Sequence, residues 1–164
     1  MKIYTKTGDN KTTQIKAGRV TKDDINVVVE GEFDEAISTI MVAQAFASAD
    51  IANVLKQIAK KMFSVASDVS GYTNSISQDD VLALEEQIDF YSKSLKPLTD
   101  FILPGGKKES SFIHLARTVV RRLERSVVAL SKEKEISQAV FCYLNRLSDF
   151  LFILGRYTEE CTIQ

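Results

Sequence analysis

Apolar side chains recur at intervals of three and four residues along most of this chain, which is the spacing of one face of an α-helix. The first stretch with this pattern, residues 25–49, contains Ile37, Ile40, Met41 and Ala45. A second begins at Asp50, a candidate N-cap, and runs to Gly71, a residue type that commonly ends helices. The pattern therefore predicts two long amphipathic helices in the first half of the chain.

Three further stretches repeat the pattern. One opens at Ser77 or Asp79 and stops at Pro97, one follows Ser110–Ser111 and continues to about residue 130, and one runs from near Ser137 to about residue 157. In no stretch do apolar and polar residues alternate strongly enough to predict a strand. Five helices of roughly 18–24 residues would each be ~30 Å long, so the sequence predicts an all-α, antiparallel five-helix bundle.

The first 24 residues differ from the rest of the chain. They are rich in Thr, Lys, Asp and Gly and show no apolar period, which predicts an ordered loop or a short extended arm. A chain of 164 residues is the size of one domain. We therefore expect a single domain over residues 1–164, with an arm at 1–24 and a helical bundle at 25–160.

Composition narrows the classes of function. Hydrophobic residues make up 45% and charged residues 26% of the chain, which is typical of a folded globular protein. The net charge of −1 gives no broad positive field, so nucleic acid is not an expected partner. The chain has one histidine, His114, and two cysteines, Cys142 and Cys161. These three residues are too few to predict a Cys/His metal site.

The sequence also predicts a compartment. No apolar run follows the N-terminal residues, so no secretory signal is expected. The longest apolar run, near Phe150–Leu154, is too short to cross a bilayer. Two cysteines without a disulfide framework fit a reducing environment. We therefore expect a cytoplasmic protein that makes no membrane contact.

The segment between the third and fourth predicted helices carries three large apolar residues, Phe101, Ile102 and Leu103. Pro104, Gly105 and Gly106 follow them and keep the segment non-helical. A loop with apolar groups of this size must cover something. Two interpretations stay open: the loop plugs the core of the bundle, or it covers a ligand.

The fourth predicted helix is rich in arginine. Arg117 and Arg121 lie one turn apart at the border of its apolar stripe, and Glu124 is placed to brace Arg121. Two neighbouring guanidinium groups can bind one polyanion, whereas Arg122 and Arg125 point further out. The alternative is a solvated basic face with surface ion pairs. His114, one turn earlier, is expected to be packed rather than catalytic.

The fifth predicted helix is apolar on almost every side. Asn145, Ser148, Asp149 and Arg156 form a narrow polar strip within that apolar coat. Polar groups buried in this way need partners. They fit either a structural network, with Asp149 bonded to an arginine and Asn145 to backbone, or a binding site.

The N-terminal arm and the start of the first helix offer further candidates. Amides, hydroxyls and ammonium groups in a glycine-containing turn can bind phosphate, although the arm lacks the P-loop spacing. A hydrophilic surface tail is the alternative. The arm residues concerned are Thr5, Lys6, Thr7, Gly8, Lys11, Thr12 and Thr13. Asp34 either complements the helix dipole or pairs with an arginine of another subunit.

Four of these segments, in order along nearly the whole chain, resemble the PduO-type ATP:cob(I)alamin adenosyltransferase family. Tyr4–Asp9 is similar to its N-terminal ATP loop and Phe101–Gly106 to its loop over the corrin. His114–Arg125 resembles its arginine helix, and Tyr143–Phe152 resembles its last-helix signature. Each motif alone is modest, but the four together are highly specific.

The resemblance implies a homotrimer of five-helix bundles with ATP at the subunit interfaces. The activity that it implies is transfer of the 5′-deoxyadenosyl group of ATP to cob(I)alamin, with release of triphosphate. Mg²⁺ is implied on the triphosphate rather than at a metal site built from protein ligands alone. A reductase and an adenosylcobalamin-dependent enzyme are the implied protein partners.

The resemblance also implies roles for individual residues. Arg121, Glu124 and Asn145, together with the Thr5–Thr13 arm, would bind ATP. Arg117 would pair with Asp34 across the interface. Phe101 would pack on the lower corrin face and displace the base that ligates cobalt, and Asp149 would belong to the corrin side. Arg121, Arg117 and Phe101 are thus the expected catalytic set.

Two departures from the family pattern affect the nucleotide site. Lys11 stands where the family usually has glycine, so a turn that needs positive φ would be strained there. Glu32 adds negative charge near the expected triphosphate. These changes keep open a second hypothesis, a divergent non-catalytic bundle that binds ATP or cobalamin as a carrier or sensor.

Overall fold

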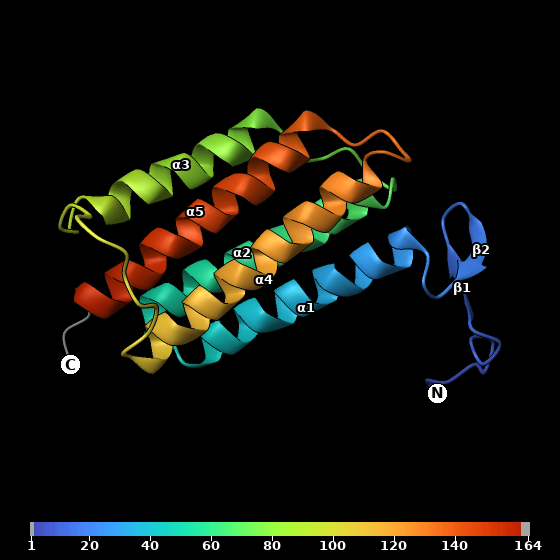
Figure 1. Ribbon diagram of the computed structural model, residues 1–164, viewed down its shortest axis with the longest axis horizontal. Helices are drawn as coiled ribbons and strands as arrows, with labels where there is room; N and C mark the ends of the chain where they lie inside the picture. The colour runs from blue at the N-terminus through green and yellow to red at the C-terminus, as the bar shows by residue number, and fades with distance from the viewer. Residues whose placement is uncertain (1, 162–164) are drawn as a thin grey trace.

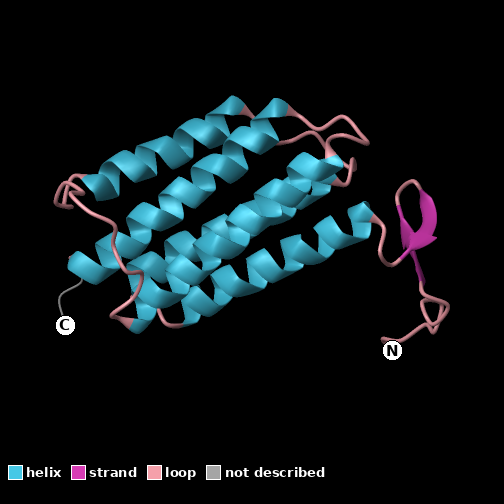
Figure 2. Cartoon of the chain, viewed as in Figure 1, coloured by secondary structure: helices cyan, strands magenta, loops and turns pink. Residues whose placement is uncertain are grey.

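The computed structural model describes residues 2–161, which form five long helices and a small hairpin (Figures 1 and 2). The ends of the expected domain, residues 1 and 162–164, lie outside the described part. Successive helices run in alternating directions, as predicted (Figure 1). The elements are β1 (Thr12–Ile15), β2 (Gly18–Thr21), α1 (Ile25–Ala45), α2 (Ala49–Val69), α3 (Gln78–Ser92), α4 (Lys108–Leu130) and α5 (Gln138–Glu160).

Capping residues explain where the helices begin. The Asp24 carboxylate accepts a hydrogen bond from the Asn26 amide at 2.8 Å, which starts α1. Ser77 and Asp80 form a capping box at the start of α3, and the Ser137 hydroxyl accepts from an amide at the start of α5. Gly71 follows α2 with a φ of +78°, which glycine adopts at little cost. The predicted roles of Ser77, Ser137 and Gly71 are confirmed.

Other predicted boundaries were wrong by a few residues. Helix α1 ends at Ala45 rather than near residue 49, and the N-cap of α2 is Ser48 rather than Asp50. Helix α3 ends at Ser92, before Pro97. Helix α4 begins at Lys108, so Ser110 lies inside it, fully buried, instead of preceding it. Helix α5 continues to Glu160, beyond the predicted end near residue 157.

The sequence predicted no strands, but the described residues contain two. Residues 12–21 form an antiparallel hairpin in which Thr12 is opposite Thr21 and Ile15 is opposite Gly18. Its β-branched residues favour extended backbone, although the run is too short and too polar to give a strong alternating pattern. The arm is therefore a hairpin preceded by a loop, and Figure 1 shows it projecting beyond one end of the bundle.

The core is built around α4 and α5. Helix α4 packs on α1 and α5, α5 also packs on α3, and α2 packs on α1. Apolar residues with no exposed surface gather on the facing sides of α4 and α5, among them Ile113, Val120, Leu123, Leu144, Leu147 and Leu151. Such burial stabilises a fold by ~1.5–3 kcal/mol for each large side chain. Within residues 2–161, none of the helices has the length and apolar character needed to span a membrane.

Replacing a core leucine tests this packing. Leu55 of α2 is fully buried, so Leu55→Ala should lower the free energy of unfolding by about 2–5 kcal/mol. The matched control is Leu82→Ala on α3, where the leucine is 46% exposed, and its effect should stay below about 1 kcal/mol. Denaturant unfolding followed by circular dichroism measures both. Equal losses for the two variants would contradict the assignment of the core.

Candidate functional site

A cavity of about 640 Å³ lies between the segment that joins α3 to α4 and the side chains of Arg117 on α4 and Phe152 on α5. Residues 98–102 form one wall, and Arg117 and Phe152 form the other. Phe101 and Leu103 are almost fully exposed. The core-plug interpretation is therefore wrong for these two residues. Exposed apolar groups of this size beside a cavity are typical of a binding surface.

Two glycines fix the path of this loop. Gly105 and Gly106 have φ values of +99° and +153°, which other residues rarely adopt. A Cβ atom at Gly106 would meet the carboxylate of Glu159, which accepts a hydrogen bond from the Lys107 amide at 3.0 Å. The loop is thus held at its α4 end, while Phe101 stays open to solvent.

Arg117 is the cation of this cavity, which the acidic residue Asp100 of the loop also lines. Its guanidinium carbon lies 5.8 Å from the centre of the Phe152 ring, a cation–π distance. Its Nε atom is buried and has no hydrogen-bond partner among the described residues. Burial, followed by the charge of Arg121, lowers the pKa of Arg117, although a guanidinium stays protonated at neutral pH. A half-buried cation with a donor that no described residue uses is suited to an external anionic partner.

His114 packs against Phe152, the ring that Arg117 contacts. It is buried, and its ring lies edge-on to Phe152 with 6.0 Å between the ring centres. The imidazole packs so closely on Gly155 that a Cβ atom there would be only 2.8 Å from Nε2. The prediction of a packed histidine is confirmed, and Gly155 is what makes room for it.

Arg121, Glu124 and Asn145 were predicted to act together. The Asn145 amide donates to Glu124 Oε1 at 3.0 Å, which joins α5 to α4. The predicted brace between Glu124 and Arg121 is wrong, because the carboxylate turns to Asn145 instead. Arg121 is exposed beside this pair, and Arg125 donates to the Arg121 carbonyl oxygen at 2.9 Å. A guanidinium group and a carboxylate–amide pair therefore share one open surface.

The rest of the polar strip on α5 is mainly structural. Asp149 accepts from Arg146 at 2.8 Å, and Arg146 also binds Glu85 of α3 at 2.9 Å. Arg156 is buried and donates to the Lys96 carbonyl oxygen at 2.8 Å, which ties α5 to the loop after α3. The predicted bond from Asp149 to an arginine is confirmed. The structural alternative also had Asn145 bonding backbone, but its side-chain amide bonds Glu124 instead.

Two acidic residues of α1, Glu32 and Glu35, lie close to an arginine of α4. Glu35 forms an ion pair with Arg122, and Glu32 lies 4.0 Å from the same guanidinium group. Arg122 was expected to point outward, but it links α4 to α1. The extra charge of Glu32 is therefore close to a cation of its own chain. Asp34 is exposed on the same helix.

The arm makes most of its bonds within itself. The Thr5 and Thr7 hydroxyls lie 2.9 Å apart, Arg19 Nε donates to the Thr12 hydroxyl at 2.9 Å, and Arg19 also binds the Thr7 carbonyl oxygen. Lys11 has a φ of +61°, so the expected positive φ at this position is confirmed. Lys6 shares this conformation at +60°. A non-glycine residue in it costs about 1–2 kcal/mol.

The single chain keeps its candidate segments apart. Figure 1 shows the arm beyond one end of the bundle and the loop after α3 at the other end. A helix of 23 residues such as α4 is about 35 Å long, which sets the scale of the separation. The structure thus groups Arg117 with the Phe101 loop, and Arg121 with Glu124 and Asn145, but it does not bring the arm to either group.

Sequence reasoning missed two residues of the site. Phe152, which forms a wall of the cavity and carries Arg117, looked like one more residue of the apolar coat of its helix. The sequence could not indicate the role of Gly155, because that role depends on contact with His114, which lies 41 positions earlier in the chain. A glycine inside a strongly helical stretch is the one clue that the sequence offered.

The fold and the site define a class of protein. The sequence model of the cobalamin adenosyltransferase family matches residues 3–158. The chain belongs to this family.

Individual relatives agree with this assignment. The chain is 41% identical to a corrinoid adenosyltransferase of Bacillus subtilis, over 95% of this chain and 86% of that protein. It is 39% identical to a corrinoid adenosyltransferase of Bos taurus, over 96% of this chain and 71% of that protein. A PduO-type ATP:corrinoid adenosyltransferase variant from Lactobacillus reuteri, solved with cobalamin and ATP, superposes with a TM-score of 0.89 at 34% identity. That match covers 96% of this chain and 93% of the other.

His114 should make stability depend on pH. Burial and then the positive charge of Arg117 lower its pKa from 6.5, while Glu159 acts in the opposite direction. The unfolded state therefore binds the proton more readily than the folded state. The contribution of neutral His114 to the free energy of unfolding is complete above pH ~6.5 and is lost as the pH falls toward the folded-state pKa. The slope is at most about 1.4 kcal/mol per pH unit. Denaturant unfolding between pH 7 and 5 should show a flatter dependence for His114→Gln. Parallel curves for the two proteins would contradict this assignment.

Proposed function

We propose that this protein transfers the 5′-deoxyadenosyl group of ATP to cob(I)alamin, forming adenosylcobalamin and triphosphate. Membership of the cobalamin adenosyltransferase family supports this activity. The observation that carries it within the chain is the pairing of an exposed aromatic loop with a desolvated arginine across one cavity. Those two features fit a large flat apolar ligand beside an anionic one.

The nucleotide side would be formed by Arg121, Glu124 and Asn145. A guanidinium group binds phosphate oxygens in a bidentate manner, and the Glu124–Asn145 pair offers acceptor and donor groups for the rest of the nucleotide. The hydroxyls, amides and ammonium groups of the Thr5–Thr13 arm would bind the triphosphate, with Mg²⁺ on its oxygens. Donors held in place before the reaction stabilise the charge of the leaving triphosphate.

The corrin side would be formed by Phe101 and Phe152. The face of an exposed phenylalanine is suited to lie on the lower face of the corrin, where it would exclude water and the base that ligates cobalt. Asp149 would lie at the edge of this environment. The cobalt atom of the substrate is the nucleophile: the Co–C5′ bond forms as the C5′–O bond to triphosphate breaks. The protein then has to align the two atoms, which needs no side chain as a base.

The complete site would be assembled from two copies of the chain in a homotrimer. The arm lies at the opposite end of the bundle from the Phe101 loop, so a neighbouring subunit is the natural source of the arm at each site. Arg117 has a buried donor with no partner within residues 2–161, and Asp34 is exposed. A pair between Arg117 and Asp34 of neighbouring subunits would satisfy that donor.

The reaction also implies a cellular setting. Cys142 and Cys161 are free thiols, which fits the cytoplasm. A reductase would supply cobalt in its nucleophilic state, and an adenosylcobalamin-dependent enzyme would use the product. A carrier or sensor would bind both substrates and release them unchanged, so product formation separates the two hypotheses.

Replacing Arg121 tests the nucleotide side. Arg121→Ala should lower kcat/KM for adenosyl transfer by at least about 100-fold, the usual effect of removing one charge-stabilising donor. The assay mixes ATP, Mg²⁺ and chemically reduced cobalamin and follows the absorbance change of Co–C bond formation. The control is Arg125→Ala, an exposed arginine of the same helix whose side chain donates to the backbone carbonyl oxygen of residue 121. A fully active Arg121→Ala protein would refute the role, and binding without product in the unmodified protein would favour the carrier.

Mixing two inactive variants tests whether the site is shared. One variant carries Arg121→Ala, and the other carries Lys6→Ala and Thr7→Ala in the arm. If each site takes its arm and its α4 from different subunits, random mixed trimers should regain about a quarter of full activity. The variants are unfolded together and refolded in equal amounts. No recovery in mixed trimers verified by mass would show that both parts come from one subunit.

A further inference from the structure

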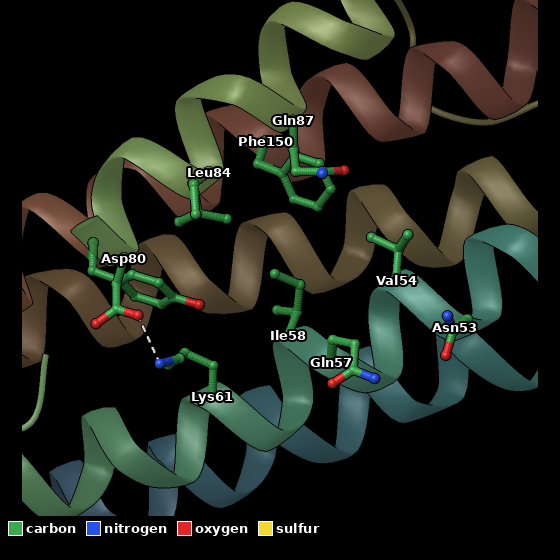
Figure 3. A pocket seen from close by; sticks show the side chains of 11 residues that line it. Asn53, Val54, Gln57, Ile58, Lys61, Asp80, Leu84, Gln87 and Phe150 are labelled. Atoms are coloured by element: carbon green, nitrogen blue, oxygen red, sulfur yellow. Dashed lines mark hydrogen bonds and ion pairs between the residues drawn. The ribbon is translucent and has the colours of Figure 1, made fainter. Parts of the chain in front are cut away.

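A second cavity of about 290 Å³ lies between α2 and α3, with α5 as its floor (Figure 3). It is separate from the proposed site, whose cavity is lined by Arg117, Phe152 and residues 98–102. Helix α2 packs on α1 and α3 packs on α5, so the space between them is left open. Its volume is near the lower end of the ~300–1,000 Å³ of small-molecule sites, which suits a compound with a single ring.

Tyr143 is the residue that distinguishes this cavity from an ordinary groove. The side chain lines the cavity and is only 2% exposed. Among the described residues, no group forms a hydrogen bond with its hydroxyl. Burial and then the charge of Asp80 raise the pKa of Tyr143, so the phenol stays neutral and keeps its proton. The side chain is buried but its hydroxyl oxygen reaches the cavity, so a ligand that enters there can accept the proton in place of water.

Asp80, the charged acceptor near Tyr143, is already bonded to other donors. Its Oδ1 atom binds Lys61 of α2 at 2.7 Å, and Oδ2 accepts from the Ser77 amide at 3.0 Å. Burial alone would raise the pKa of Asp80, but these hydrogen bonds lower it overall. The carboxylate thus stays ionised and engaged with other donors, and it forms no hydrogen bond with the Tyr143 hydroxyl in the described structure. Figure 3 shows the Lys61–Asp80 bond joining the two helices at one side of the cavity.

The remaining walls define the body of a ligand. Figure 3 shows Leu84 and Phe150 on one side facing Ile58 and Val54 on the other, which gives an apolar slot. The amide side chains of Asn53, Gln57 and Gln87 also line the cavity. Charge within the cavity is balanced because Lys61 and Asp80 neutralise each other. An anion would meet Asp80, and a cation would have to compete with Lys61. An uncharged molecule is therefore favoured.

We propose that this cavity binds a small uncharged molecule with a flat apolar body and a hydrogen-bond acceptor that takes the proton of the Tyr143 hydroxyl. Carbonyl oxygens and ring nitrogens have the required chemistry. Helix α5 would then carry ligands on two sides, because Tyr143 and Asn145 are about 200° apart around its axis.

The probe for this site is 4-fluorobenzamide, a neutral ring with a carbonyl acceptor, titrated against the full chain by ¹⁹F NMR. Saturable binding is expected, and Tyr143→Phe should weaken it about threefold to tenfold, the usual effect of one hydrogen bond. Fluorobenzene has the same ring without an acceptor, so Tyr143→Phe should leave its affinity unchanged. The anion 4-fluorobenzoate should bind more weakly than the amide.

Two further variants complete the design. Tyr91→Phe removes the hydroxyl of a buried tyrosine that does not line this cavity, so the affinity for 4-fluorobenzamide should stay the same. Ala83→Leu places a larger side chain at the cavity and should weaken both ring probes, which keeps the proposal testable if Tyr143→Phe does not fold. The absence of saturable binding to the unmodified protein would overturn the proposal. Equal affinities of 4-fluorobenzamide for the unmodified protein and Tyr143→Phe would overturn it as well.

Discussion

The antiparallel packing of α4 on α5 is the contact on which the other parts of the molecule depend. It buries the apolar stripes of both helices, and each helix then offers a second face to a neighbour: α4 to α1 and α5 to α3. The same contact sets the proposed chemistry. Glu124 meets Asn145 across it, and Arg117 lies over Phe152 across it. A close approach at Gly155, where the His114 ring lies against the backbone, keeps the two helices in this register.

Polar groups around this contact fall into two kinds. Arg146, Arg156 and Arg122 have carboxylate partners within the chain, so they hold helices and loops together. Arg117 has a buried donor without a partner in the part of the chain that the structure describes. Arginines whose hydrogen bonds are complete stabilise a monomer, whereas an arginine with an unused buried donor indicates a ligand or a second subunit. This difference separates Arg117 from the structural arginines, whereas Arg121 is distinguished by its exposure beside the Glu124–Asn145 pair.

Much of the fold could be predicted because helical periodicity is a local property. The five helices and the caps at Ser77 and Ser137 follow from residues within one turn of each other. The hairpin was missed because four-residue strands give little alternation. The Arg121–Glu124 brace was predicted wrongly because spacing along one helix cannot reveal a competing partner on another. Phe152 was missed for the same reason: its surroundings come from the loop after α3, which its own sequence does not encode.

The way α3 is attached has a consequence for local unfolding. It is the shortest helix of the described chain and packs mainly on α5, because the side toward α2 is open. Segments with few buried contacts open at lower free energy than the rest of a protein. Helix α3 and the loop that follows it therefore form the natural unit of partial opening, held at its end by Arg156 and Glu159. Such opening would move the aromatic loop while leaving the arginine helix folded, which gives a bulky substrate a way in and out.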